Sequence, residues 1–90
     1  MFSFEIKKND ETTRARLGKM TTAHGEIQTP AFMPVATHAT VKGISSEEIL
    51  DMGFQMIIAN AYHLYLRPGH KRIEKLGGLH KFMNWNKPIT

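Results

Sequence analysis

A short apolar run, Ile57-Ile58-Ala59, leads directly into Asn60 and a mixed polar and aromatic segment that ends at Pro68-Gly69. Polar side chains at the carboxyl end of a buried parallel strand are typical of α/β folds, which build their sites at that edge. This run therefore predicts an α/β fold with a candidate site that begins at Asn60.

Residues 1–29 predict an antiparallel lead-in to that fold. Phe2, Phe4 and Ile6 alternate with polar residues, which indicates a strand with one buried face. A later turn at residues 23–25 ends in a glycine and predicts a hairpin between two further strands.

Residues 30–90 predict the first βα units of a parallel sheet. Ser45 and Glu48 have the spacing of a capping box, which places a helix start between two apolar strands. The strands are expected over 31–36, an apolar run suited to burial on both faces, and over 54–59. Further helices are expected over 68–76 and near 79–83. A strand, a helix and a second strand make a parallel βαβ unit, as in a (β/α) barrel or a doubly wound sheet.

The length of 90 residues limits the chain to one domain or part of one. A closed (β/α)8 barrel needs about 250 residues. We therefore expect an incomplete barrel here, with apolar surface that its missing neighbours must cover.

Composition favours a polyanionic partner and argues against several classes of protein. The 12 Lys and Arg outnumber the 8 Asp and Glu, although groups such as Lys71/Arg72/Lys75 are also typical of solvated helix faces. The chain has no cysteine, and its 5 histidines lack metal-binding spacing, so no metal site is expected. No apolar run approaches the roughly 18 residues that span a bilayer, and we expect a cytoplasmic protein.

The residues after the second strand leave two interpretations open. Asn60 can orient a carboxylate or a sugar hydroxyl, or it can satisfy local backbone groups as a loop asparagine. Tyr62, His63, Tyr65 and Arg67 can stack on bases and meet phosphate, or they can serve packing. The acids lie in hairpin or helix-surface contexts, and none has the pattern of a buried catalytic carboxylate.

Three segments, taken in order, resemble the N-terminal portion of the bacterial tRNA-guanine transglycosylases. They run from Thr29 to Gly43 with Phe-Met-Pro-Val inside, from Asn60 to Gly69 with Tyr-His-Leu inside, and from Gly77 to Trp85. The resemblance implies that residues 1–90 are the N-terminal part of a single catalytic domain. That domain is a TIM (β/α)8 barrel preceded by an antiparallel sheet.

The resemblance also implies a reaction. The family exchanges the anticodon wobble guanine of tRNA for a 7-deazaguanine base, preQ1 or queuine, in queuosine biosynthesis. One Asp attacks C1′ of a flipped-out nucleotide, a second Asp transfers protons, and a structural zinc lies near the C-terminal end. The second Asp belongs to an Asp-Ser-Gly-Gly motif expected directly after Thr90, and the nucleophile and zinc motif follow later. We therefore expect residues 1–90 alone to bind no zinc or cofactor and to transfer no base.

The family's pocket-supporting positions match Val35, Ile58, Asn60 and Ala61, with Asn60 beside the proton-transferring Asp and Val35 and Ile58 near the target ribose. Where the family usually has Gly-Asn-Thr, this chain has Ala59-Asn60-Ala61. Bacterial members are homodimers, and the expected contact residues match Lys42, Tyr62, His63, Phe82 and Trp85. Two alternatives remain, a non-catalytic accessory subunit of the same fold and a basic RNA-binding module.

Overall fold

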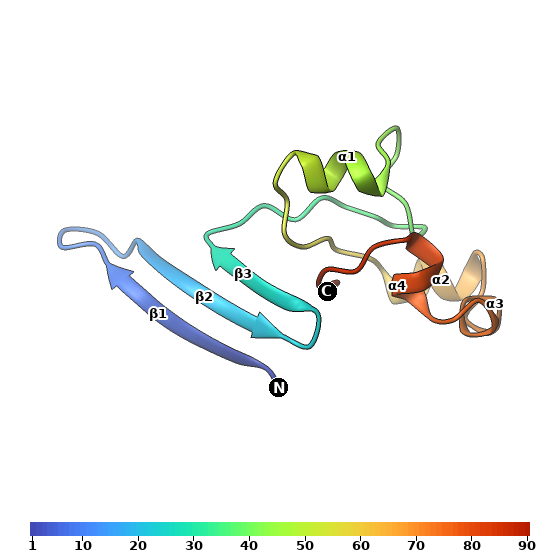
Figure 1. The fold of residues 1–90 in the computed structure, drawn as a ribbon, viewed down its shortest axis with the longest axis horizontal. Helices are drawn as coiled ribbons and strands as arrows, with labels where there is room; N and C mark the ends of the chain where they lie inside the picture. Colours follow the sequence, from blue (N-terminus) through green and yellow to red (C-terminus); the bar gives the residue numbers. More distant parts are fainter.

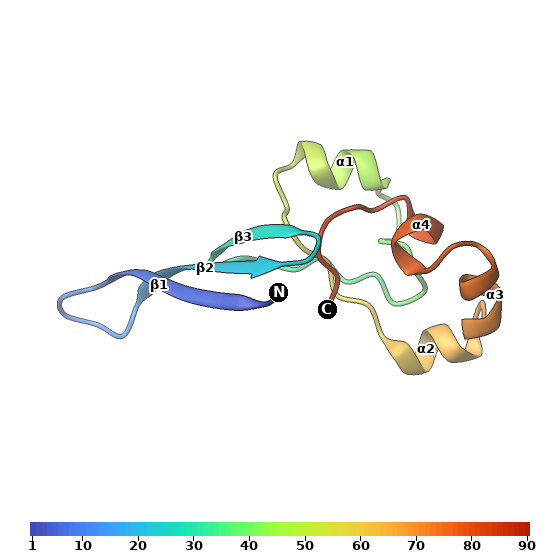
Figure 2. The same cartoon turned by 60° about the horizontal axis from the view of Figure 1, so that its bottom comes forward.

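A computed structural model describes residues 1–90 as an antiparallel sheet joined to a cluster of short helices (Figure 1). The three strands are β1 (Ser3–Asn9), β2 (Arg16–Thr22) and β3 (Gly25–Thr29), in that order in the sheet. The helices are α1 (Ser46–Asp51), α2 (Ala61–Leu66), α3 (His70–Lys75) and α4 (Leu79–Met83). Figure 2 shows the sheet projecting away from the helices. The radius of gyration is accordingly 15.1 Å, against about 12 Å for a compact domain of this length.

The antiparallel lead-in is confirmed, but the buried face predicted for its first strand is wrong within residues 1–90. β2 and β3 pair from Gly18↔Thr29 to Thr22↔Gly25, and Gly25 has the positive φ of +127° that the turn requires. In β1, however, Phe4 and Ile6 are each 49% exposed. No element of the described residues covers this face of the strand.

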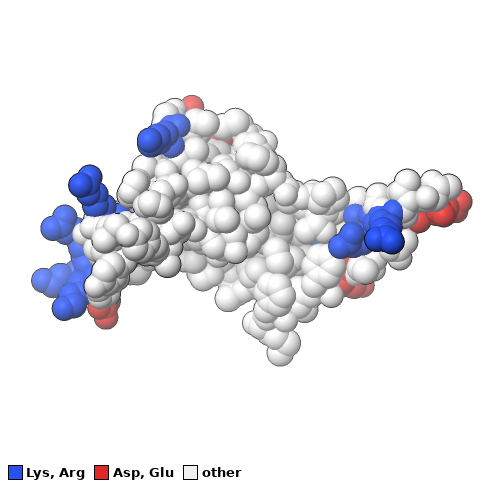
Figure 3. Space-filling model, turned by 180° about the vertical axis from the view of Figure 1, so that it is seen from behind, with Lys and Arg blue, Asp and Glu red and all other residues white.

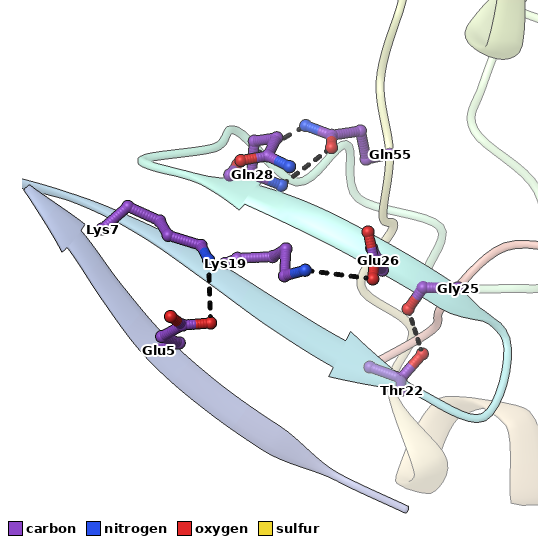
Figure 4. Close-up of polar contacts among 8 residues, drawn as sticks. All are labelled: Glu5, Lys7, Lys19, Thr22, Gly25, Glu26, Gln28 and Gln55. Carbon is purple, nitrogen blue, oxygen red and sulfur yellow. Dashed lines mark hydrogen bonds and ion pairs between the residues drawn. The ribbon is translucent and has the colours of Figure 1, made fainter.

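Polar contacts hold the sheet together and tie it to the rest of the chain (Figure 4). Lys19 of β2 forms an ion pair with Glu26 of β3 at 3.3 Å. The Gln55 side chain accepts a hydrogen bond from the Gln28 N–H at 2.8 Å and donates one to the Gln28 carbonyl at 3.5 Å. Gln55 therefore binds the free edge of β3 as a neighbouring strand would.

Three extended segments outside the sheet run parallel to one another. Val35 bridges Ile58, and Ile57 bridges Ile89, both in the parallel sense. The segment 57–59 therefore lies between 34–36 and 88–90, and the predicted parallel direction is confirmed. Each contact is a single bridge rather than a long ladder, as expected next to Pro34 and Pro88, which have no N–H to donate.

The burial predicted for residues 31–36 on both faces is wrong, because Phe32 is 70% and Val35 is 61% exposed.

The capping box of α1 is confirmed. Ser45 Oγ accepts from Glu48 N at 3.2 Å, and the Glu48 carboxylate accepts from Ser45 N at 3.0 Å. The helices predicted over 68–76 and 79–83 are present as α3 and α4, whereas α2 was not predicted.

The core lies between the helices and the parallel segments rather than under the antiparallel sheet. It contains one buried residue or more from each helix and from the segments around them: Ala36, Ala39, Ile49, Ile57, Leu64, Ile73, Met83 and Trp85. Only 12 of 90 residues are buried, so a large apolar surface is left for other contacts. None of the helices has the length and hydropathy that a bilayer-spanning segment requires.

Candidate functional site

The candidate site lies where the three parallel segments end. Because they run in the same direction, their carboxyl ends meet at one edge, as in α/β folds generally. Ala36 N donates to Ile58 O at 2.7 Å, and Ala59 N donates to Thr90 O at 2.9 Å. This pairing brings the predicted residues Val35 and Ile58 together and places Asn60 directly after the central segment.

Asn60 is the N-cap of α2. Its Oδ1 accepts hydrogen bonds from Tyr62 N at 3.0 Å and from His63 N at 3.3 Å. Of the two interpretations of Asn60, the local one is therefore observed. The cap uses only the oxygen, and the exposed Nδ2 has no hydrogen-bond partner in the chain. Its two N–H groups remain available to a ligand or to a neighbouring carboxylate.

A tight turn after Ala36 brings a second set of side chains to this edge. Ala39 N donates to Ala36 O at 3.2 Å, and Ala39 adopts a φ of +64°, which is unusual for a residue with a Cβ. The turn directs His38 toward α2, where its ring lies edge-on to His63 with centroids 5.6 Å apart. His38 was given no role from the sequence, although it lies within the Thr29–Gly43 segment.

Beside this turn lies an open depression of about 390 Å³, lined by Val35, Thr37, His38, Thr40, Val41 and Lys42. It combines apolar side chains, an imidazole and an ammonium group. Such a lining can contact the apolar face of a sugar while the cation meets an anionic group. Of the predicted pocket-supporting residues Val35, Ile58, Asn60 and Ala61, only Val35 lines this depression, where it lies with His38 and Lys42.

The residues expected to contact a second copy are not equally accessible. Tyr62 is 68% exposed, Lys42 is also exposed, and His63 and Phe82 are half-buried. Trp85 is only 1% exposed, and its Nε1 donates to Pro88 O at 3.1 Å. Our expectation of Trp85 as an exposed contact residue is corrected, because its indole belongs to the core.

Two histidines that lie far apart in the sequence, His24 and His80, form a stacked pair. The rings of His24 and His80 lie 3.6 Å apart with 8° between their planes. His80 Nε2 also lies 3.0 Å from Lys87 O. Burial, and then the neighbouring His24, lower the pKa of His80. The pair joins the β2–β3 turn to α4, and no local sequence signal indicates so distant a contact.

The acids are all exposed, and Glu47 alone contacts a distant part of the chain, where it accepts a hydrogen bond from Asn84 Nδ2 at 3.1 Å. The Thr13 hydroxyl and the N–H groups of Thr12 and Thr13 lower the pKa of Asp10, and Ser45 lowers that of Glu48. These are turn and cap interactions. No group of three or more His, Asp or Glu side chains comes together, and there is no cysteine. The residues present therefore do not fit the structural zinc that the resemblance implies.

The sequence of this chain matches one family of known proteins. A family model described as queuine tRNA-ribosyltransferase matches residues 10–90. The queuine tRNA-ribosyltransferase of Desulforudis audaxviator is 58% identical over 86 residues, which cover 96% of this chain and 23% of the relative. That of Prochlorococcus marinus is 56% identical over 89 residues, or 99% of this chain and 24% of the relative.

The relative from Fusobacterium nucleatum, with the same name, is 60% identical over 83 residues, covering 92% of this chain and 22% of its own length. The chain thus spans about a quarter of the length of these curated relatives. The family match covers the parallel segments, Asn60 and all four helices. The chain therefore belongs to the queuine tRNA-ribosyltransferase family.

Proposed function

We propose that residues 1–90 are the N-terminal part of an enzyme that exchanges the wobble guanine of tRNA for a 7-deazaguanine base, preQ1 or queuine. In this proposal the antiparallel sheet precedes a TIM (β/α)8 barrel, and the parallel segments are its first strands. These residues build one wall of the pocket, and later residues supply the carboxylates. Family membership and the relatives' common name support the reaction class.

One observation supports the proposal that these residues build one wall of the pocket. Ala59 N donates to Thr90 O at 2.9 Å, and Ile57 bridges Ile89 in parallel register. Consecutive Cα atoms are about 3.8 Å apart. A residue that follows Thr90 along the same strand therefore lies opposite Ala59 and next to Asn60. An Asp at that position is within reach of the unpaired Asn60 Nδ2.

The chemistry then assigns a role to each residue of the wall. Val35 and Ile58 contact the ribose of a flipped-out nucleotide, and Asn60 orients the Asp after Thr90. That Asp protonates the departing guanine as the bond between C1′ and the base breaks. The second carboxylate, which is the nucleophile supplied by later residues, bonds to C1′ at the same time. The incoming base then bonds to C1′, releases the second carboxylate and returns its proton. Asn60 acts through the Asp and is a positioning residue.

The test is incorporation of labelled guanine into tRNA by the intact protein. We expect exchange with a tRNA that has guanine at the wobble position and none with the same tRNA carrying adenine there. The 90-residue chain alone should exchange nothing. An intact protein that binds tRNA without exchanging guanine would instead match the accessory subunit. Exchange by the isolated chain would contradict the proposal that later residues supply the carboxylates.

We also propose that the intact protein is a cytoplasmic homodimer whose contact includes Lys42, Tyr62, His63 and Phe82. The 68% exposure of Tyr62 supports this, since a large exposed aromatic side chain is typical of interfaces. The structural zinc belongs to later residues in this proposal. Sedimentation of the intact protein should give a dimer, and Tyr62→Ser should shift it toward monomer.

A further inference from the structure

The corner between α2 and α3 carries a concentration of positive charge, which we call the basic corner: Arg67, Lys71, Arg72 and Lys75. Glu74 is the only acid between Arg67 and Lys75, so four of the 12 basic and one of the 8 acidic residues lie within this stretch. The rest of the chain is nearly balanced. Figure 3 shows a group of Lys and Arg side chains in blue, with a small acidic group in red beside them, at the end of the molecule where α3 lies.

The cations of the basic corner have no acidic partners. The ion pairs in the chain, Lys7 with Glu5 and Lys19 with Glu26, both lie in the antiparallel sheet. Lys71, Arg72 and Lys75 instead line an open depression of about 620 Å³, together with Tyr65 and His70. Unpaired cations around one concavity raise the local potential and attract anions.

The basic corner is fixed relative to the candidate site. Gly69 N donates to Leu64 O at 2.9 Å across the turn, and the Tyr65 and His70 rings stack with centroids 5.0 Å apart. Leu64 of α2 and Ile73 of α3 are both buried in the same core. These contacts hold α3 firmly against α2, whose other end is capped by Asn60.

We propose that the basic corner binds the phosphate backbone of tRNA beside the nucleotide that enters the pocket, an inference that rests on the proposed function. α2 has 6 residues, and a helix rises about 1.5 Å per residue. The corner therefore begins about 9 Å from the pocket edge, within reach of phosphates that flank the target nucleotide. Such contacts position the RNA without reading its bases.

The charge also argues against two other occupants. A second copy of this chain would bring a like-charged corner against this one, which is unfavourable. A solvated helix face is the ordinary explanation of a basic run, but it does not explain why three cations line one depression whose lining includes no carboxylate and form no ion pair with Glu74. A polyanion satisfies all of them at once.

The test compares two triple variants of the intact protein. Lys71→Gln, Arg72→Gln and Lys75→Gln remove three of the four charges of the basic corner. Lys8→Gln, Arg14→Gln and Arg16→Gln remove the same charge from exposed positions in β1, in β2 and in the connection between them. At about 100 mM salt we expect the first variant to raise the Kd for tRNA at least about tenfold. The slope of log Kd against log salt should become shallower by about 2 to 3.

The second variant should change the Kd less than about threefold, since it removes only distant charge. The first should also raise KM for tRNA and leave kcat at saturating tRNA unchanged. Equal effects of both variants, or an unchanged salt slope, would overturn the phosphate contact. Guanine exchange by the parent protein would still support the proposed function in that case. A parent that neither binds tRNA nor exchanges guanine overturns both. A change of oligomeric state confined to the first variant would assign the corner to a protein interface.

Discussion

Asn60 combines two roles that substitution can separate. The cap depends on an acceptor oxygen, which receives hydrogen bonds from Tyr62 N and His63 N. Ser keeps such an oxygen, and Ala does not. Asn, Asp and Ser are about equal as N-caps, whereas replacing them with Ala costs about 1 kcal/mol. We therefore expect Asn60→Ala to lower the free energy of unfolding of the intact protein by about 1 kcal/mol and Asn60→Ser to leave it nearly unchanged.

Activity should follow a different pattern, because it depends on the amide nitrogen. Asn60 Nδ2 is free in this chain and is proposed to orient the Asp that follows Thr90. A hydrogen bond to a charged group is worth about 1.5 to 3 kcal/mol, which corresponds to about a 10- to 150-fold change in rate. Ser ends too early along the side chain to replace it. Both Asn60→Ser and Asn60→Ala should lower kcat for guanine exchange by roughly that factor.

The assay pairs urea unfolding with labelled-guanine exchange on the same preparations. The predicted result is that Asn60→Ser keeps the stability of the parent and loses activity. If Asn60→Ser retained the parental kcat, Asn60 would be a helix cap alone and the proposed pocket role would be wrong. If Asn60→Ala had no effect on unfolding, the capping argument itself would be wrong.

Three further predictions concern stability, all measured by denaturant unfolding of the intact protein. Trp85→Ala should cost about 3 to 5 kcal/mol because the indole is fully buried, and Trp85→Phe should cost much less; a loss below about 1 kcal/mol for Ala would place the indole outside the core. The lowered pKa of His80 means that the unfolded state takes up the proton first. Stability should therefore fall as the pH drops below the unfolded value of about 6.5 and level off below the folded value, and His80→Gln should flatten this slope. A Cβ on Gly18 would lie 2.6 Å from Phe4 Cζ, so Gly18→Ala should cost about 1 kcal/mol and show a coupling energy with Phe4→Ala, and strict additivity of the two changes would refute the contact.

The features that could be predicted from the sequence are those fixed by local chemistry. The capping box needs only Ser45 and Glu48 at their spacing, and the β2–β3 turn needs Gly25 at a positive φ. The parallel direction of the later segments followed from the order of strand, helix and strand. Each of these depends on residues close together in the chain or on a topological rule.

The errors arise where several parts of the chain meet. α2 was missed because the segment from Asn60 to Gly69 was interpreted as a loop after the strand, although Asn60 as an N-cap with Leu64 on the buried side was an available signal. Trp85 was expected as an exposed contact residue from the resemblance to homodimeric proteins, and its burial depends on the core formed by all four helices. The stacking of His24 on His80 is likewise a long-range contact. The exposure of Phe4 and Val35 shows that an alternating pattern or an apolar run marks residues suited to burial without identifying what covers them.

The central claim is that the parallel register brings the residue after Thr90 to Asn60, where it serves as the proton-transferring acid. The most direct measurement is the rate of guanine exchange by the intact protein after that residue is changed from Asp to Asn. The account predicts a rate lower by about 10² to 10⁴, with the urea unfolding midpoint retained. An unchanged rate, or full exchange by an intact protein with no carboxylate at that position, would contradict it.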